Sequence, residues 1–178
     1  MALDFLPTAL LCDVAPEPIA LLPRVRRLWR GATLAGPAVT VRTPPGELAS
    51  VRQALDGAQR GDVIVVDCGG SLATALWGDR MSKLALERGV AGLVVDGAVR
   101  DADGIEELRF PVFAAGVVPT PPGRDVLGEV GNPIECAGRL VSPGDLVYGD
   151  GDGVVVVPAA IHDEVVAKAR IALEQETA

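Results

Sequence analysis

The chain has 178 residues, a length that fits one domain with a full hydrophobic core. Its net charge of −8 argues against the basic face that a nucleic acid backbone needs, so we expect no nucleic acid partner. No apolar run is long enough to span a membrane, and residues 1–5 lack the pattern of a signal peptide. Three cysteines without CxxC spacing do not suggest a disulfide framework. From these features together we expect a cytoplasmic protein with no membrane partner.

The first half of the chain alternates predicted helices and strands. Hydrophobic residues make up 49% of the chain and aromatic residues only 3%, so a core of Val, Leu, Ile and Ala is expected. Runs of β-branched residues with frequent glycine predict a sheet that is buried on both faces. The predicted elements are a helical entry over 6–18, a strand over 39–42, a helix over 47–59 and a strand over 63–67.

A helix and a strand follow in the centre of the chain. The helix is predicted to begin at Asp79 as its N-cap and to end at Gly89, with an apolar face at the helical period. Residues 91–96 predict a buried strand, and Gly97 is expected to open a turn. A single helical turn over 105–108 and a strand over 111–114 complete this region.

The last third of the chain is rich in short strands. They are predicted around 140–141, 146–148 and 154–157, and a docking helix is predicted over about 159–175. The order of βα units followed by a β-rich return indicates an α/β fold, with a single domain over residues 1–178.

Asp79 and the pair Arg100-Asp101 are the most informative residues of the chain. A helix of about ten residues falls roughly 15 Å, and a strand of five or six climbs back roughly 17–20 Å. The chain therefore returns to the edge that it left, and the three side chains are expected to meet at the carboxyl end of the sheet, where α/β proteins usually place ligands. Two carboxylates, a guanidinium and a helix N-terminus suit a divalent cation and a small anionic substrate.

These residues also carry a family resemblance that extends over roughly residues 5–160. The stretches concerned are 36–41, 61–67, 78–79, 92–101, 110–114 and 143–158. In them the chain resembles the 4-hydroxy-4-methyl-2-oxoglutarate aldolase family, which shares its fold with the regulator of ribonuclease activity A. The resemblance implies a β/β/α swivelling-domain sandwich, a fold with which the predicted order of elements agrees.

The resemblance also implies an activity and roles for particular residues. It predicts a class II aldolase that depends on Mg²⁺ or Mn²⁺, releases pyruvate from a 4-hydroxy-2-oxo acid and decarboxylates oxaloacetate as a side activity. Asp101 is the predicted metal ligand, Arg100 a catalytic residue that binds substrate, and Asp79 a catalytic residue that holds a proton-transferring water.

Substrate contacts and assembly follow from the same resemblance. Gly78, Asp79, Arg80 and Met81 form the predicted substrate-binding helix N-terminus, together with Arg100. The expected partner is a small 2-oxo acid, and the expected assembly is a homotrimer or a dimer of trimers. Some family members carry an acidic residue three positions after the metal aspartate, whereas this chain has Gly104 there, just after Asp103.

Each of these residues has a simpler structural interpretation. Asp101 could cap the helical turn that follows it, and Asp79 could cap its own helix. Arg100 could form a surface ion pair with Glu106 or Glu107. The spacing of the three residues favours the ligand-binding interpretation of Asp101 and Arg100, whereas for Asp79 the two roles do not exclude each other.

Other candidate motifs carry less weight. The segment 149–153 resembles a calcium loop, but Ile161 stands where an EF-hand needs glutamate, so a hairpin is expected. Gly69-Gly70-Ser71 lacks the Gly-Lys-Ser/Thr of a phosphate loop. His162, the only histidine, lies on the last predicted helix, and Lys83 is expected to be an ordinary surface lysine rather than a Schiff base.

An alternative function follows from the same resemblance. The family's name-giving members inhibit a ribonuclease by contact, so the chain could be a non-enzymatic protein-binding regulator. Such a role does not need a metal-binding aspartate, and the Arg100-Asp101 pair therefore favours the enzyme.

Overall fold

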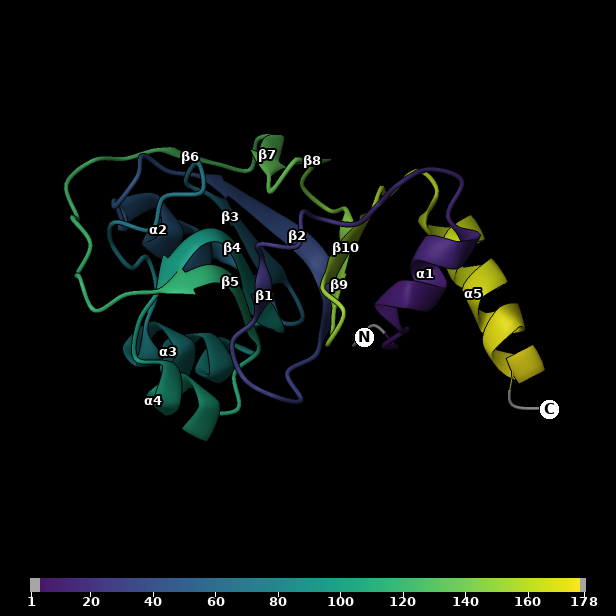
Figure 1. Ribbon diagram of the computed structural model, residues 1–178. Helices are drawn as coiled ribbons and strands as arrows, with labels where there is room; N and C mark the ends of the chain where they lie inside the picture. Colours follow the sequence, from purple (N-terminus) through teal and green to yellow (C-terminus); the bar gives the residue numbers. More distant parts are fainter. Residues whose placement is uncertain (1–3, 177–178) are drawn as a thin grey trace.

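Strand β2 (Leu34–Arg42) organises the fold, because its two halves pair with different neighbours. In the computed structural model, which describes residues 4–176, the second half pairs in parallel with β3 (Val63–Asp67). The first half pairs antiparallel with β9 (Leu146–Gly149). The strand order is β1-β5-β4-β3-β2-β9-β10, so β2 joins the central βα units to the β-rich return (Figure 1).

The remaining elements flank this sheet or extend it. The other strands are β1 (Arg26–Arg27), β4 (Gly92–Val99), β5 (Val112–Val117), β6 (Glu129–Val130), β7 (Ile134–Cys136), β8 (Arg139–Val141) and β10 (Val154–Val157). The helices are α1 (Thr8–Val14), α2 (Ala49–Gly57), α3 (Asp79–Arg88), α4 (Ala102–Glu107) and α5 (His162–Glu176). Strand β6 pairs with β2, and β7 and β8 form a separate two-stranded sheet.

The segment before β2 nearly closes the sheet into a barrel. The Leu21 amide donates to the carbonyl of Val154 on β10 at 2.9 Å. A few residues later, β1 pairs with β5, and the Leu28 amide donates to the carbonyl of Val112 at 2.8 Å. Residues 19–28 therefore contact both outer strands, which covers edges that would otherwise be open to pairing with another chain.

Two apolar layers meet at the central strands. Along β3, Val63 and Val65 belong to the core inside the barrel, whereas Ile64 and Val66 belong to the core beneath the helices. All four side chains are fully buried, and each contributes about 2 kcal/mol through the hydrophobic effect. The prediction of a sheet buried on both faces is confirmed.

Helices α1 and α5 form a third layer on the outer face of β9 and β10 (Figure 1). Val165 and Ala169 of α5 and Leu11 of α1 are buried there against Tyr148 of β9. The predicted docking helix is thus present, and it begins at His162 rather than at residue 159.

Two predicted strands have the expected bounds, whereas the end of β4 differs from the prediction for a local reason. Strands β3 and β10 begin and end where they were predicted. The turn expected at Gly97 is wrong: β4 continues through it to Val99, with a register irregularity between Val95 and Ala98. A Cβ at position 97 would overlap the sulfur of Cys68, so this bulge in the strand requires glycine.

The mixed α/β fold expected from the sequence is confirmed, and it consists of a nearly closed sheet with helices outside it. Within residues 4–176, no helix combines the length and the apolar content that crossing a bilayer requires. The predicted domain covers residues 1–178, of which 1–3 and 177–178 lie outside the described residues. The signal-peptide expectation concerned residues 1–5, so most of that segment also lies outside the described residues.

Candidate active site

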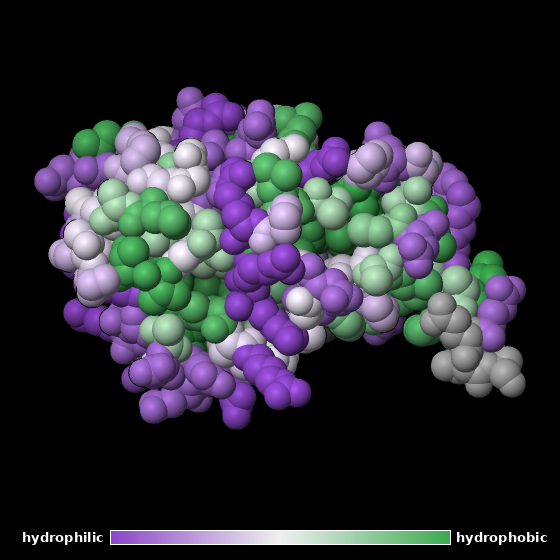
Figure 2. Space-filling model, viewed as in Figure 1, coloured by the Kyte–Doolittle hydropathy of each residue, from purple (hydrophilic) through white to green (hydrophobic). Residues whose placement is uncertain are grey.

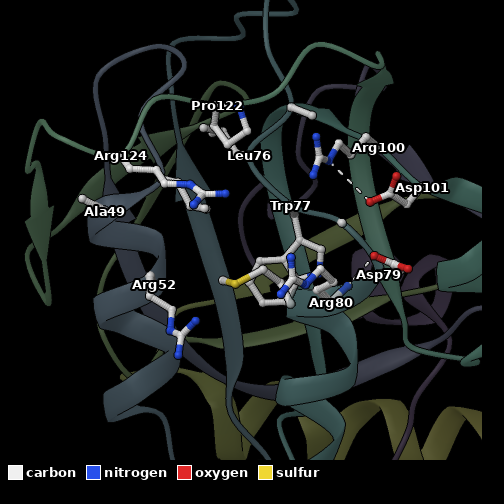
Figure 3. A pocket seen from close by; sticks show the side chains of 14 residues that line it. Ala49, Arg52, Leu76, Trp77, Asp79, Arg80, Arg100, Asp101, Pro122 and Arg124 are labelled. Carbon is white, nitrogen blue, oxygen red and sulfur yellow. Dashed lines mark hydrogen bonds and ion pairs between the residues drawn. The ribbon is translucent and has the colours of Figure 1, made fainter.

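The chain returns to the carboxyl end of β4 as the sequence predicts. The Leu76 amide donates to the carbonyl of Ala98, and the Arg100 amide donates to the carbonyl of Trp77, each at 2.9 Å. These bonds place the start of α3 beside the end of β4. Asp79, Arg100 and Asp101 consequently line one cleft of about 470 Å³ (Figure 3).

The start of α3 is fixed by buried polar contacts. Gly78, and not Asp79 as predicted, is the N-cap residue, and Asp79 is the first residue of the helix. The Trp77 indole donates to Ser82 Oγ at 2.7 Å, and the Ser82 hydroxyl donates to the Gly78 carbonyl at 3.1 Å. Asp79 is therefore in the first turn of the helix, and Figure 3 shows its carboxylate on the same side of the cleft as Asp101.

The amides at this helix start are partly free. The Arg80 amide donates to Asp79 Oδ1 at 2.6 Å, and the Ser82 amide donates to the Gly78 carbonyl at 3.1 Å. The amides of Asp79 and Met81 have no acceptor among residues 4–176, as expected for the first turn of a helix. They leave room for one anionic group at the positive end of the helix dipole.

Asp101 stands at the N-cap position of α4 but does not act as a cap. Its backbone is left-handed, with φ 57° and ψ 41°, and its side chain makes no capping hydrogen bond. Such a backbone is uncommon for a residue other than glycine, and aspartate is one of the side chains that tolerate it. The Asp101 side chain is 40% exposed and lines the cleft, so it is available to a ligand.

Arg100 pairs with its neighbour. Its Nε lies 3.4 Å from Asp101 Oδ2, and Figure 3 shows this contact as the dashed line between the two side chains. Glu106 and Glu107, the alternative partners considered from the sequence, form no ion pair with it within the described chain. The Arg100 side chain is 34% exposed and lines the cleft, so it can reach a molecule there.

The donor set suits a hydrated cation better than a closed metal cage. Among residues 4–176 there is no cluster of three or more His, Cys, Asp or Glu side chains that could hold a metal. Mg²⁺ commonly uses one or two carboxylates and keeps several waters, which substrate oxygens can replace. Asp101, with Asp79 across the same corner of the cleft (Figure 3), fits that mode of binding.

Gly104 lies behind this corner. A Cβ at position 104 would stand 3.2 Å from the Cβ of Asp79, so even a small side chain there would press on Asp79. Glycine thus keeps the space beside the Asp79 carboxylate open.

Residues set aside from the sequence lie outside the cleft. His162 Nε2 lies 3.2 Å from the Tyr148 hydroxyl at the start of α5, and Lys83 is exposed on α3. Segment 149–153 is the turn of the β9–β10 hairpin. Burial raises the pKa of the Cys68 thiol to about 11, which makes it a poor nucleophile.

The sequence interpretation missed two arginines that line the cleft. Arg52 lies on α2, one turn after Leu48, and Arg124 lies on the loop between β5 and β6. Desolvation opposes ionisation of Asp56, but hydrogen bonds from Arg88 and Arg52 outweigh it and lower the pKa of Asp56. The helical periodicity of α2 could have placed Arg52 on the exposed face of that helix. No local sequence pattern indicates that Arg124 lies in the cleft.

Comparison with known proteins places this geometry in a family. The model of the RraA-like family, described as Aldolase/RraA, matches residues 8–156. The chain belongs to the Aldolase/RraA family. The predicted resemblance is therefore confirmed over most of its extent.

Two similar proteins from Thermus carry names of different kinds. A protein of Thermus thermophilus named 4-hydroxy-4-methyl-2-oxoglutarate aldolase is 39% identical over 149 residues, covering 83% of this chain and 90% of the relative. A solved structure from the same genus, described as the RNA-processing inhibitor RraA, has a TM-score of 0.79 at 36% identity. That match covers 85% of this chain and 92% of the other.

A third match shows that the likeness extends to nearly the whole fold. A structure of an uncharacterized protein from Pseudomonas syringae has a TM-score of 0.88 at 33% identity. It covers 97% of this chain and 81% of the other. The likeness thus extends to α5, which lies beyond the residues matched by the family model.

Proposed function

We propose that the chain is a class II aldolase dependent on a divalent metal, Mg²⁺ or Mn²⁺. Its substrate would be 4-hydroxy-4-methyl-2-oxoglutarate or a similar 4-hydroxy-2-oxo acid, cleaved to pyruvate and a second oxo acid. Decarboxylation of oxaloacetate would accompany this reaction, since both proceed through the enolate of pyruvate. The observation that carries the proposal is the meeting of Asp79, Arg100 and Asp101 at the N-terminus of α3.

The helix start would bind the carboxylate of the substrate. The amides of Asp79 and Met81 are available there, and the helix dipole favours an anion. Binding at this point places the adjacent 2-oxo group beside Arg100, which lines the same cleft. Gly78, Arg80 and Met81 thus contribute mainly through their backbone and the shape that they give to the cleft.

Arg100 would stabilise the negative charge that develops on the enolate oxygen. Its guanidinium is half-buried and is held by Asp101, so it is oriented before the substrate arrives. One hydrogen-bond donor directed at a developing oxyanion typically contributes about 10²–10³ in rate.

Asp101 would hold the cation, and Asp79 would hold the water that moves protons. A divalent cation bound there supplies Lewis-acid polarisation of the 2-oxo group. Asp79 accepts the Arg80 amide through Oδ1, which leaves Oδ2 free to accept a hydrogen bond from that water. Through the water, Asp79 would take the proton of the C4 hydroxyl during cleavage and return one to the enolate.

The test of this proposal is pyruvate release from several 4-hydroxy-2-oxo acids and from oxaloacetate, with and without Mg²⁺ or Mn²⁺. Activity should disappear in excess chelator and return with metal, and Asp101→Asn should not recover at ordinary metal concentrations. Glu106→Gln is the matched control, because it removes an exposed carboxylate one turn further along α4. Full activity in chelator, or equal activity of the two variants, would refute the metal-dependent mechanism.

A second candidate function follows from the Thermus structure described as an RNA-processing inhibitor. A contact inhibitor of a ribonuclease would need a protein-binding surface but neither Asp101 nor Arg100. If no 4-hydroxy-2-oxo acid is cleaved, inhibition of a ribonuclease by both the wild type and Asp101→Asn would support this alternative.

We also propose a cytoplasmic homotrimer or dimer of trimers, as the family resemblance suggests. Figure 2 shows apolar side chains gathered over the end of β5, where Leu72 and Val117 are about half exposed. A Cβ at Gly116, the neighbour of Val117, would stand 3.0 Å from the Leu72 side chain. Leu72 and Val117 therefore lie at the same end of β5. Light scattering at micromolar concentration tests the assembly, and a monomer would contradict it.

A further inference from the structure

Helix α3 begins at Gly78 without a capping side chain. Many helices begin with a Ser, Thr, Asp or Asn side chain that accepts one of the first amides, whereas this N-cap is glycine and makes no side-chain hydrogen bond. The amides of Asp79 and Met81 consequently stay available within the described chain. Glycine also allows more backbone conformations than any other residue, so the direction of these amides has to be fixed by other contacts.

The carbonyl of Gly78 is held by two donors of Ser82. The Ser82 amide donates to it at 3.1 Å, as in any α-helix, and the Ser82 hydroxyl also donates to it at 3.1 Å. This carbonyl belongs to the same planar trans peptide group as the Asp79 amide, so the C=O and the N–H point in opposite directions. Holding the Gly78 carbonyl toward Ser82 therefore directs the Asp79 N–H out of the helix start, where Gly78 and Asp79 line the cleft.

Trp77 sets the orientation of the Ser82 hydroxyl. The Trp77 indole N–H, which can only donate, lies 2.7 Å from Ser82 Oγ. Because the hydroxyl oxygen accepts this bond, its single hydrogen is left for the Gly78 carbonyl. Ser82 is fully buried and Trp77 is 2% exposed, so water does not compete for either bond.

The core beneath the helices holds Trp77 in turn. Its ring stacks on the ring of Phe110, with centroids 5.9 Å apart and 14° between the ring planes. Phe110 is fully buried, and the Trp77 carbonyl accepts the Arg100 amide at 2.9 Å. The ring and the backbone of Trp77 are therefore both fixed. A continuous chain of contacts thus leads from the apolar core to the Asp79 amide at the cleft (Figure 3).

We propose that Ser82 and Trp77 are positioning residues for the carboxylate of the substrate. They act through the Gly78 carbonyl, which aims the Asp79 amide at that carboxylate before the substrate arrives. The inference rests on the proposed function, in that the carboxylate binds at the start of α3. It assigns a role to two buried hydrogen bonds that the proposed reaction does not otherwise use.

Two ligands of the same shape separate this role from the general integrity of the cleft. Pyruvate has the carboxylate, and pyruvamide has a neutral amide in its place. Titration calorimetry with Mg²⁺ present should show that the wild type prefers pyruvate. Ser82→Ala should reduce this preference about tenfold, with little change in the affinity for pyruvamide. Damage to the cleft as a whole would weaken the binding of both ligands alike, and that result would overturn the inference.

Steady-state kinetics provide a second measurement. The carboxylate of the substrate takes no part in the breaking of the carbon–carbon bond, so its contact with the Asp79 amide is made equally in the ground state and the transition state. Ser82→Ala should therefore raise KM about tenfold and leave kcat nearly unchanged. A fall in kcat with KM unchanged would contradict a role in holding the carboxylate.

Thr40→Val is the matched control. Thr40 is also fully buried, and its hydroxyl also donates to a backbone carbonyl, that of Asn132 at 2.7 Å, but it lies on β2 and does not line the cleft. The substitution should lower stability in urea unfolding and keep the wild-type preference for pyruvate. Loss of the preference in Thr40→Val as well would show that general destabilisation is the cause.

Trp77→Phe tests the chain of contacts one step earlier. Phenylalanine keeps an aromatic ring beside Phe110, and it leaves no buried donor without a partner, so this variant should fold even if Ser82→Ala does not. It should reduce the preference for pyruvate to a smaller extent than Ser82→Ala, because Ser82 can still donate to Gly78. The double variant should lose no more than Ser82→Ala alone, whereas additive losses would overturn the proposed order of contacts.

Activity assays separate failure of this inference from failure of the proposed function. If 4-hydroxy-4-methyl-2-oxoglutarate is cleaved and both variants keep the wild-type preference for pyruvate, the positioning role is wrong but the aldolase stands. If no 4-hydroxy-2-oxo acid is cleaved while the preference still depends on Ser82, the positioning role stands at an anion site and the aldolase is wrong. Equal affinities of the wild type for pyruvate and pyruvamide would overturn the inference.

Discussion

Gly78 leaves open the space that the Asp101 carboxylate occupies. A Cβ at position 78 would overlap Asp101 Oδ2 and would stand 3.4 Å from the Cγ of Arg100. The backbone of Gly78 is extended, with φ −153°, so any residue could adopt it. Glycine is needed here because of the neighbouring carboxylate and not because of its own conformation.

Gly78→Ala should therefore damage the proposed site more than the fold. The added methyl group should displace the Asp101 carboxylate, and a displacement of about 1 Å in a catalytic group can lower turnover by about 10²-fold. Stability should fall by about 1 kcal/mol at most, since alanine is a poor N-cap. Pyruvate release and urea unfolding measure the two effects.

Gly57→Ala is the control for this substitution, because a Cβ at position 57 would meet no atom within 4 Å. It should leave turnover near the wild-type value. Normal metal-dependent activity of Gly78→Ala would show that the position of Asp101 is not critical.

Asp150 should stabilise the docking of α1 in a manner that depends on pH. Its carboxylate accepts the Thr8 amide at 2.9 Å and the Thr8 hydroxyl at 2.7 Å, at the start of α1. Desolvation opposes ionisation, but these hydrogen bonds outweigh it and hold the pKa of Asp150 below its ordinary value. Asp150→Asn should cost about 1 kcal/mol at neutral pH, a low value because the group is partly exposed.

The sign of the pH effect follows from the lowered pKa of Asp150. The stabilisation is fully present above the unfolded pKa of about 3.9 and is lost as the pH falls through the lower folded pKa. The difference in unfolding free energy between wild type and Asp150→Asn should thus shrink below about pH 4. Asp152→Asn in the same turn is the control, and a difference that stays constant in acid would contradict this role.

Cys12 should be the thiol that reacts in the folded protein. Cys12 is exposed, whereas Cys68 and Cys136 are buried. Burial raises the pKa of all three thiols, to about 11 for Cys68, so it is the exposed position of Cys12 that makes it the one a reagent can reach. A disulfide-exchange reagent should titrate about one thiol per chain before denaturation and all three after it. Rapid reaction of three thiols in the folded protein would show that the core opens readily.

Local signals in the sequence predicted the centre of the fold well. Helix α3 ends at Gly89 in the left-handed conformation, as a glycine after an amphipathic helix indicates. The βα return then followed from element lengths alone, which is why the meeting of Asp79 with Arg100 and Asp101 could be predicted. Their chemical roles were inferred from the family resemblance and stay predictions.

Elements determined by distant contacts were harder to predict. Strand β2 was predicted to begin at residue 39, after the Gly36-Pro37 step, but it begins at Leu34. Pro37 is tolerated because the parallel pairing with β3 begins only at Ala38, and Pro37 itself pairs with Leu146 of β9. Strand β1 has two residues and exists because residues 19–28 pair with both outer strands, which no local pattern reveals.

The presence of Arg52 and Arg124 in the cleft was not predicted, for the same reason. Arg124 is brought to α2 by the hydrogen bonds of Glu47 with a loop almost eighty residues further along the chain. No periodicity or spacing links Arg52 to Arg124. Only the folded chain places these two arginines on one wall.

Asp79→Asn should impair aldol cleavage much more than oxaloacetate decarboxylation. Cleavage must remove a proton from the C4 hydroxyl before the carbon–carbon bond breaks, whereas decarboxylation has no such proton to remove. Asparagine has the size of aspartate, and its Oδ1 can still accept the Arg80 amide that Asp79 accepts at 2.6 Å. It cannot accept a proton from a bound water, and loss of a general base typically costs about 10²–10⁴ in rate.

The measurement is the ratio of the two turnover numbers in one purified variant. The rate of oxaloacetate loss with metal alone is subtracted, and Glu87→Gln, an exposed charge change on the same helix, is the control. A ratio that falls by about 10²-fold or more would identify Asp79 as the residue that handles the hydroxyl proton. If both reactions fall alike, Asp79 positions the substrate or the start of α3 and does not act as the base, because a structural role affects every reaction that uses the cleft.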